Sequence, residues 1–337
     1  MFCMISVMSQ ADDMKWQWKL QKSGVETSIR GLGAVDEKVC WFGTGGGVVG
    51  RTIDGGKTWE RFVIKGAEKL EIRDVGAIDA DRCLAMSVGE GTDSRVYQTK
   101  DGGGTWQLVH RNEAPKGFYN GMAFWDEKKG ILAGDPVGGQ LVVLRTTDGG
   151  STWKSLPDTP AMEEGEHAFA ASGTHVTVAK GGHVWVASGG RVARVFHSAD
   201  FGETWSVRET PMIAGEPSTG IFSLAFADAR TGFAVGGDYE KEDEGTRNAM
   251  ATSDGGQSWT LLKNQEGESV FPFRSCVRWD PDSETLITTG PEGSNWSRDG
   301  GKTWTAIPGR GFHTLSIGGS LRAVWAAGSE GRIGRLR

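Results

Sequence analysis

Six copies of one short motif, S/T-x-D-x-G-x-T/S-W, constrain the fold of this 337-residue chain more than any other feature. The first copy is TIDGGKTW at residues 52–59, and the six aspartates are Asp54, Asp101, Asp148, Asp200, Asp254 and Asp299. Successive aspartates are separated by 47, 47, 52, 54 and 45 residues. Self-similarity at a period near 50 residues indicates a repeat architecture, in which each repeat is one supersecondary unit.

The residue types of the motif suit a tight turn between two strands. Aspartate is short enough to accept hydrogen bonds from backbone N–H groups a few residues on, and glycine takes positive φ without steric cost. The Ser or Thr hydroxyl adds a local hydrogen bond, and the tryptophan begins the next strand with a large apolar surface. We therefore interpret the six aspartates as structural, since a metal or sugar site has no reason to recur six times with the same turn chemistry.

The repeats resemble the Asp-box, or BNR, repeats of sialidases, of many glycoside hydrolases and of the photosystem II assembly and stability factors. The resemblance covers roughly residues 14–337. It implies a β-propeller and is much less specific for any one activity. The repeat spacing and the length are most similar to the assembly factors and their bacterial relatives, in which an arginine-rich patch on the propeller face contacts the client protein.

Each repeat can be written as four strands, with the motif as the turn between the third and the fourth. The first repeat has strands at 29–35, 39–43, 48–53 and 58–63, and later repeats start near Ile72, Tyr119, Ala168, Ile221 and Phe273. Three strands remain at the C-terminus, at 312–317, 323–327 and 332–336. The alternating segment 15–21 at the N-terminus supplies a fourth, which would close the ring and remove its open edges. We predict an all-β propeller of seven four-stranded blades, with six blades as the alternative, formed by residues 14–337 as a single domain.

The net charge of −6 and the sequence pI near 5.6 argue against a nucleic-acid surface, which requires a basic stripe. No segment beyond the N-terminus approaches the length of a membrane span. Residues 1–13, MFCMISVMSQADD, form an apolar run followed by a small-x-small sequence, without a basic region before it. They are either the remnant of a signal peptide, which favours a periplasmic or secreted protein, or a disordered leader of a cytoplasmic one.

The four cysteines show no metal-binding spacing. Cys40 and Cys83 occupy similar places in neighbouring repeats, so a disulfide between them is possible. Buried reduced thiols in strands are the alternative that we favour. We expect no cofactor and no metal.

Function is expected at the face opposite the motif turns, where the innermost strand of every blade begins. Equivalent positions at these strand starts converge on the mouth of the central channel, and they are occupied by Arg30, Arg73, Asn120, His167 or Ala168, Phe222, Arg274 and His313. Asp135 and Tyr239, in loops between second and third strands, could face the same mouth. Unpaired guanidinium groups in a concave site favour carboxylate or phosphate ligands. Alternatively, each arginine pairs with a local acid such as Glu71, Asp74 or Glu166 and lines a water-filled channel.

A sialidase needs three arginines, a Tyr–Glu nucleophile pair and an acidic residue. The tyrosines are Tyr97, Tyr119 and Tyr239, and none lies in the last two repeats, where sialidases place the nucleophile. The arginine-bearing element that sialidases carry near the N-terminus reads Ser-Ile-Arg-Gly at residues 28–31 and departs from their pattern. We therefore predict a monomeric, non-catalytic module that docks a protein client or an anionic or glycan ligand, with a glycoside hydrolase as the alternative. The run Glu240–Glu244 is expected to be a solvated loop tip.

Overall fold

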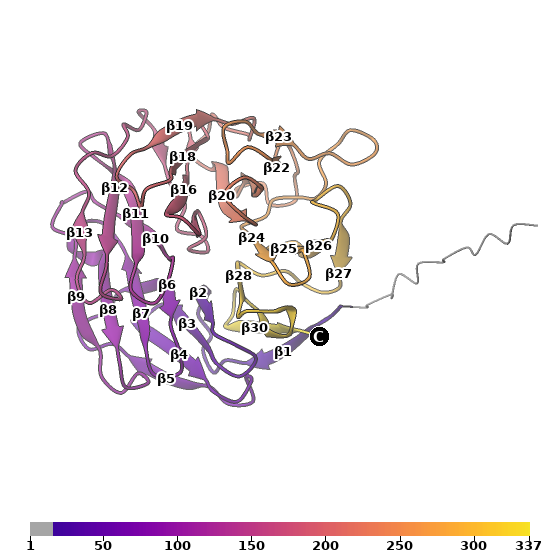
Figure 1. Ribbon diagram of the computed structural model, residues 1–337. Helices are drawn as coiled ribbons and strands as arrows, with labels where there is room; N and C mark the ends of the chain where they lie inside the picture. Colours follow the sequence, from indigo (N-terminus) through magenta and orange to yellow (C-terminus); the bar gives the residue numbers. More distant parts are fainter. Residues whose placement is uncertain (1–15) are drawn as a thin grey trace, which may run out of the picture.

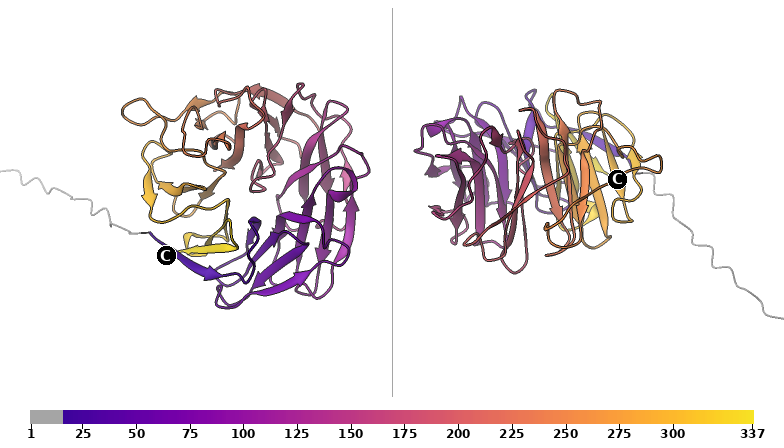
Figure 2. Two further views of the ribbon diagram at one scale, coloured as in Figure 1. Left: turned by 180° about the vertical axis from the view of Figure 1, so that it is seen from behind. Right: turned by 90° about the horizontal axis from the view of Figure 1, so that it is seen from above.

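The computed structural model describes residues 16–337, which form seven antiparallel sheets arranged radially around a central axis (Figure 1). Figure 2 shows the ring from behind and from above. The prediction of an all-β, seven-bladed propeller is confirmed. The leader or signal segment expected at residues 1–13 lies outside the described residues, so export stays a prediction.

Six sheets follow the order of the chain. Blade 1 comprises β2 (Ile29–Ala34), β3 (Cys40–Thr44), β4 (Val48–Thr52) and β5 (Glu60–Val63). Blade 2 comprises β6 (Glu71–Ala77), β7 (Cys83–Val88), β8 (Arg95–Thr99) and β9 (Gln107–Arg111). Blade 3 comprises β10 (Tyr119–Phe124), β11 (Gly130–Val137), β12 (Gln140–Thr146) and β13 (Lys154–Ser155). Blade 4 comprises β15 (Val176–Ala179), β16 (His183–Ala187), β18 (Arg194–Ser198) and β19 (Ser206–Glu209).

Blade 5 comprises β20 (Thr219–Phe226), β21 (Gly232–Asp238), β22 (Ala249–Thr252) and β23 (Thr260–Leu261). The short strands β14 (Glu166–His167) and β17 (Gly189–Gly190) extend its sheet beyond β20. Blade 6 comprises β24 (Cys276–Asp280), β25 (Thr285–Gly290), β26 (Gly293–Ser297) and β27 (Thr305–Ile307). Blade 7 comprises β28 (Thr314–Ile317), β29 (Val324–Ala327), β30 (Arg332–Leu336) and the N-terminal β1 (Trp18–Lys22). Two 3-10 turns, Gly91–Asp93 and Leu321–Ala323, complete the assignment.

The ring closes as the sequence predicts, because the N-terminal strand pairs with the last strand of the chain. β1 runs antiparallel to β30, with Trp18 opposite Leu336 and Lys22 opposite Arg332. Both termini of the propeller are thereby held in one sheet, and the N-terminal strand becomes the outer edge of blade 7. Because the ring is closed, every blade packs between two neighbouring blades, and no blade in residues 16–337 has an open sheet face.

The six motif turns share one hydrogen-bond pattern, illustrated by the first. Asp54 Oδ1 accepts the backbone N–H of Thr58 at 3.0 Å, and Asp54 Oδ2 accepts the Thr58 hydroxyl at 2.6 Å. The Thr52 hydroxyl donates to Asp54 Oδ1 and accepts the Gly56 N–H. The tryptophan after each turn packs between blades: the rings of Trp59 in blade 1 and Trp325 in blade 7 are 5.9 Å apart and nearly perpendicular. The turns therefore brace each blade at the face away from the inner-strand starts.

Blade 4 departs from the predicted pattern. Its inner strand begins at Val176, not near Ala168, so the prediction of an inner strand at His167 or Ala168 is wrong. Residues 168–175, which we call the crossing segment, instead enter the ring of inner strands (Figure 1). Their sequence, AFAASGTH, is rich in small residues, which allows the backbone to pass through the narrow space between blades.

The crossing segment is tied to the inner ends of six other blades. The Ser172 hydroxyl donates to the carbonyl of Ser275 in blade 6, and the Ser172 carbonyl accepts from Thr314 in blade 7. The carbonyl of Thr174 accepts the backbone N–H of Leu224 in blade 5 at 2.9 Å. Side chains of blades 1, 2 and 3 donate to backbone carbonyls of the segment: Arg30 to Ala171, Arg73 to Ala170 and Asn120 to Ala168. Residues 168–171 of the segment line one cavity, and Gly173 lines another.

Cys40, Cys83 and Cys276 are buried free thiols, so the alternative of a disulfide between Cys40 and Cys83 is wrong. The two side chains pack into different hydrophobic clusters, one with Trp325 and the other with Trp41. Burial raises the pKa of both thiols. In the part of the chain that the structure describes, no helix is long and apolar enough to cross a membrane.

Candidate functional site

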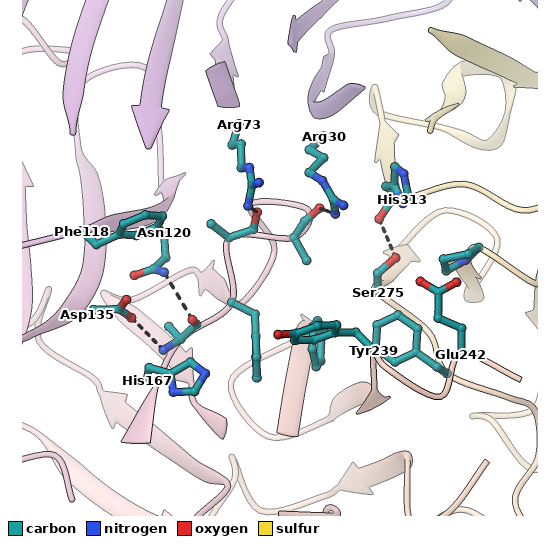
Figure 3. A pocket seen from close by; sticks show the side chains of 17 residues that line it. Arg30, Arg73, Phe118, Asn120, Asp135, His167, Tyr239, Glu242, Ser275 and His313 are labelled. Atoms are coloured by element: carbon teal, nitrogen blue, oxygen red, sulfur yellow. Dashed lines mark hydrogen bonds between the residues drawn. The ribbon is translucent and has the colours of Figure 1, made fainter. Parts of the chain in front are cut away.

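A cavity of about 370 Å³ lies where the inner strands begin, opposite the motif turns. The crossing segment forms its floor through Ala168–Ala171. Figure 3 shows side chains from several blades pointing into this space. Of the residues predicted at the mouth, all but Arg274 line it: Arg30, Arg73, Asn120, Asp135, His167, Ala168, Phe222, Tyr239 and His313.

β-Bulges aim the side chains of four inner strands into the cavity. In blade 1, Ile29 pairs with Thr44 and Gly31 with Gly43, which leaves Arg30 as the extra residue. The same register shift leaves Arg73, Asn120 and Phe222 unpaired at the start of their strands. A bulge re-aims the side chain of its extra residue, so one backbone irregularity repeated in four blades builds most of the wall.

Arg30 and Arg73 form the basic wall of the cavity. The Nη1 of Arg73 donates to the carbonyl oxygen of Ala170 at 3.3 Å, and the Nη1 of Arg30 donates to that of Ala171 at 3.5 Å. The Nε of Arg73 also lies 2.9 Å from the Glu71 carboxylate, with both side chains about one-third exposed. Burial and the neighbouring Arg73 lower the pKa of Arg30. Each guanidinium keeps further N–H donors for a ligand, since a guanidinium carries five.

Arg274 does not join this wall, so the predicted cluster of three arginines is wrong. Its side chain is 4% exposed and is absent from the cavity lining. The Nη1 and Nη2 groups donate to the carbonyl of Phe273 at 2.9 Å and to Asn295 Oδ1 at 2.8 Å. Burial lowers the pKa of Arg274 to about 10. The residue precedes β24, whose pairing has no bulge, and Ser275 lines the cavity in its place.

Asp135 and Asn120 form a polar corner of the cavity at blade 3. Asp135 Oδ1 accepts the backbone N–H of Ala168 at 2.9 Å, and Asn120 Nδ2 donates to the Ala168 carbonyl at 3.4 Å. Burial raises the pKa of Asp135, while the Ala168 N–H, His167 and the Asn120 amide oppose that shift. The His167 ring is held by a contact of 3.1 Å between its Nε2 and the Pro217 carbonyl.

An aromatic group faces the arginines. Phe169 of the crossing segment stacks on Phe222 with ring centroids 3.8 Å apart. Tyr239 meets both rings edge-on, at 6.3 and 6.1 Å, and is 45% exposed. Phe273 packs against Phe222 at a right angle. The cavity therefore offers an apolar surface beside its charged walls.

His313 and Glu242 complete the rim. Burial, followed by the charges of nearby arginines including Arg30, lowers the pKa of His313 to about 3, so its imidazole is neutral at neutral pH. Its Nε2 lies 3.2 Å from the Ser28 hydroxyl. Glu242 lines the cavity, although its run was predicted to be a solvated loop tip, and burial and the neighbouring Glu292 raise its pKa.

The sequence did not predict two parts of the site, the crossing segment and Glu242. The interval between Asp148 and Asp200, 52 residues against 47 in the first two steps, is the signal of the extra chain in blade 4. The interval to Asp254, 54 residues, similarly reflects the long loop that carries Glu242. Within residues 16–337, no group of three or more His, Cys, Asp and Glu side chains could hold a metal ion.

Comparisons with known proteins identify the fold class. No protein-family model matches the chain, and no curated protein matches it in sequence. Among solved structures, YCF48 from Cyanidioschyzon merolae is similar with a TM-score of 0.68 and 16% identity, covering 95% of this chain and 98% of that one. YCF48 bound to D1 peptide is similar with a TM-score of 0.60 and 16% identity, covering 94% and 96%. The Pan2 WD40 domain of Neurospora crassa has a TM-score of 0.62 at 12% identity, covering 92% and 89%. These identities establish the propeller fold alone.

Proposed function

We propose that this propeller is a non-catalytic docking module, which binds a segment of a client protein in the cavity at the channel mouth. One observation carries the proposal: the same cavity contains two guanidinium groups, those of Arg30 and Arg73, and an apolar surface. The crossing segment forms the floor of this cavity. Guanidinium forks bind carboxylates in a bidentate manner, and aromatic side chains dominate the energetics of protein interfaces. An acidic, partly apolar peptide segment satisfies both walls.

The similarity to YCF48 bound to D1 peptide supports the proposal, because it places a peptide-binding protein among the propellers of the same fold. The architecture supports it as well. The crossing segment and the inner-strand bulges fix the cavity walls before any ligand arrives, and a preorganised site loses less entropy on binding.

Affinity capture tests this function. The purified propeller is immobilised and exposed to a protein extract of its native source, beside the double variant Arg30→Ala, Arg73→Ala. The matched control is Arg82→Ala, Arg230→Ala, which removes two guanidinium groups from hairpins at the opposite face. We expect the wild type and the control to capture the same proteins, and the mouth variant to retain less than about a tenth of them. Equal capture by all three proteins would contradict docking at the mouth.

A glycosidase is the second candidate, because Asp135, Tyr239 and Glu242 line the same cavity as the two arginines. Glycoside hydrolysis uses two carboxyl groups, one of which acts as an acid with a raised pKa. Both Asp135 and Glu242 have raised pKa values. A panel of fluorogenic glycosides, including a sialoside, separates the two candidates. Turnover that disappears in Asp135→Asn favours the hydrolase, and binding without turnover favours docking.

A further inference from the structure

The side-chain oxygen of Asn120 in the cavity wall lacks a hydrogen-bond partner among the described residues. Asn120 is 1% exposed and lines the cavity, and its Oδ1 accepts no hydrogen bond from the residues that the structure describes. The Nδ2 of the same amide donates to the Ala168 carbonyl at 3.4 Å. Buried polar atoms in folded proteins almost always have a partner, so an orphaned acceptor in a cavity calls for a ligand that donates.

A carboxylate lies next to this acceptor. Asp135 uses Oδ1 to accept the Ala168 N–H, and none of the salt bridges in residues 16–337 involves Asp135. Asp135 accepts the N–H of Ala168 and Asn120 donates to the carbonyl of the same residue, which places the two side chains close together. Figure 3 shows Asn120, Asp135 and His167 on one side of the cavity and the two arginines on another. An acceptor and an acid in one corner favour a donor that carries positive charge.

The corner suits an ammonium group better than a metal ion. An ammonium has three donors, enough to satisfy Asn120 Oδ1 and the second oxygen of Asp135 together. In residues 16–337 no group of three or more His, Cys, Asp and Glu side chains could hold a metal ion, here or elsewhere. Phe118, which lines the cavity beside Asn120, offers an apolar surface for the aliphatic stem of a lysine side chain.

We propose that Asp135 and Asn120 form an amine subsite, so that the docked protein segment presents a lysine ammonium there and an acidic group to Arg30 and Arg73. This inference rests on the proposed docking function and specifies its ligand. The arginines lie on one wall of the cavity and Asp135 on another. Because these opposite charges do not pair with each other, the cavity favours a ligand that carries both a negative and a positive group. The carboxyl groups of Asp135 and Glu242 repel a purely anionic ligand, and this repulsion makes the cavity selective for a ligand of mixed charge.

Selection from a displayed library of random octapeptides tests the subsite. The wild type is compared with Asp135→Asn, in which the amide oxygen still accepts the Ala168 N–H while the charge is lost. Glu242→Gln, which neutralises the other carboxyl group of the cavity, tests whether that group binds the lysine instead. Asp158→Asn, at an exposed position outside the cavity lining, is the matched control. We expect wild-type peptides to be enriched in both acidic residues and lysine, Asp135→Asn to lose the lysine enrichment alone, Glu242→Gln to keep the lysine enrichment, and Asp158→Asn to keep both.

The outcomes separate this inference from the function on which it rests. Acidic enrichment without lysine in the wild type, or lysine enrichment that depends on Glu242 and not on Asp135, overturns the amine subsite and leaves docking intact. Selection of no peptide overturns both proposals. A second measurement does not depend on any protein variant: the best wild-type peptide is compared with its norleucine analogue by calorimetry. We expect the analogue to bind at least about tenfold more weakly, and equal affinities would overturn the subsite.

Discussion

The backbone of Gly173 in the crossing segment lies directly against the carboxylate of Asp74 in blade 2. A Cβ atom at Gly173 would lie 2.5 Å from Asp74 Oδ1, a distance that side chains do not tolerate. Gly173 also has a φ of +69°, which favours glycine. Asp74 in turn accepts the backbone N–H of Met122 at 2.6 Å and so links blade 2 to blade 3. The crossing segment is therefore packed against a carboxylate that holds two blades together.

Gly173→Ala should destabilise the propeller by roughly 2–4 kcal/mol, since it combines an unfavourable φ with a clash against buried groups. Gly138→Ala is the matched control, because Gly138 has a φ of +62° and a Cβ atom added there would meet no other atom within 4 Å. The control should cost only about 1 kcal/mol. Urea unfolding gives both free energies. Equal losses in the two variants would show that the channel has room for a larger side chain.

Asp74 should make stability depend on pH in a direction opposite to that of most carboxylates. Burial raises its pKa to about 7 from an ordinary value of 3.8, although the Met122 N–H, Arg278 and the Val75 N–H oppose the shift. Between these values the folded state holds a proton that the unfolded chain has released. The stability contributed by this group is therefore fully present below about pH 3.8 and is lost as the pH rises through about 7.

The comparison of wild type with Asp74→Asn isolates this effect. Burial lowers the pKa of His175 to about 3 and that of His197 to about 4, so these groups make stability increase as the pH rises over part of the same range. Both histidines are present in the two proteins, so their effect cancels in the comparison. The free energies of unfolding are measured from pH 4 to pH 8. As the pH rises, the stability of the variant relative to the wild type should increase. A difference that stays constant across this range would mean that Asp74 titrates normally.

The sequence predicted the position of a side chain where its position in the repeat determines it. It did not predict the position of a side chain that is held by partners far away in the sequence. Arg30, Arg73 and Asn120 follow Ile or Tyr at the same point of each repeat, so their equivalence could be seen in the repeat register. Arg274 occupies a similar place, but its direction is set by Asn295, 21 residues away in the sequence. The path of the crossing segment depends on partners still further along the chain, such as Ser275, which is 103 residues from Ser172.

The two kinds of arginine should respond differently to truncation. Arg274→Ala leaves Asn295 Oδ1 and the Phe273 carbonyl without their donor, which should cost about 1–3 kcal/mol of stability and little client binding. The double variant Arg30→Ala, Arg73→Ala loses only long contacts to the crossing segment and a partly exposed ion pair, so its stability should change by about 1 kcal/mol or less. Its binding to captured client should fall at least about tenfold. Urea unfolding and calorimetry measure the two properties separately, and the reverse pattern would place the binding surface at Arg274.

Asp148→Ala tests whether the motif turns only support the fold. The carboxylate accepts the Thr152 N–H at 2.9 Å, the Thr152 hydroxyl at 2.7 Å and the Thr146 hydroxyl at 2.8 Å. Losing these bonds should lower the free energy of unfolding by about 1–3 kcal/mol. Asp158→Ala, at an exposed position outside the motif, is the control and should be nearly neutral. Because the turn lies at the face away from the cavity, client binding by folded Asp148→Ala should equal that of the wild type. Unchanged stability together with lost binding would reverse the assignment and make the turn face the functional one.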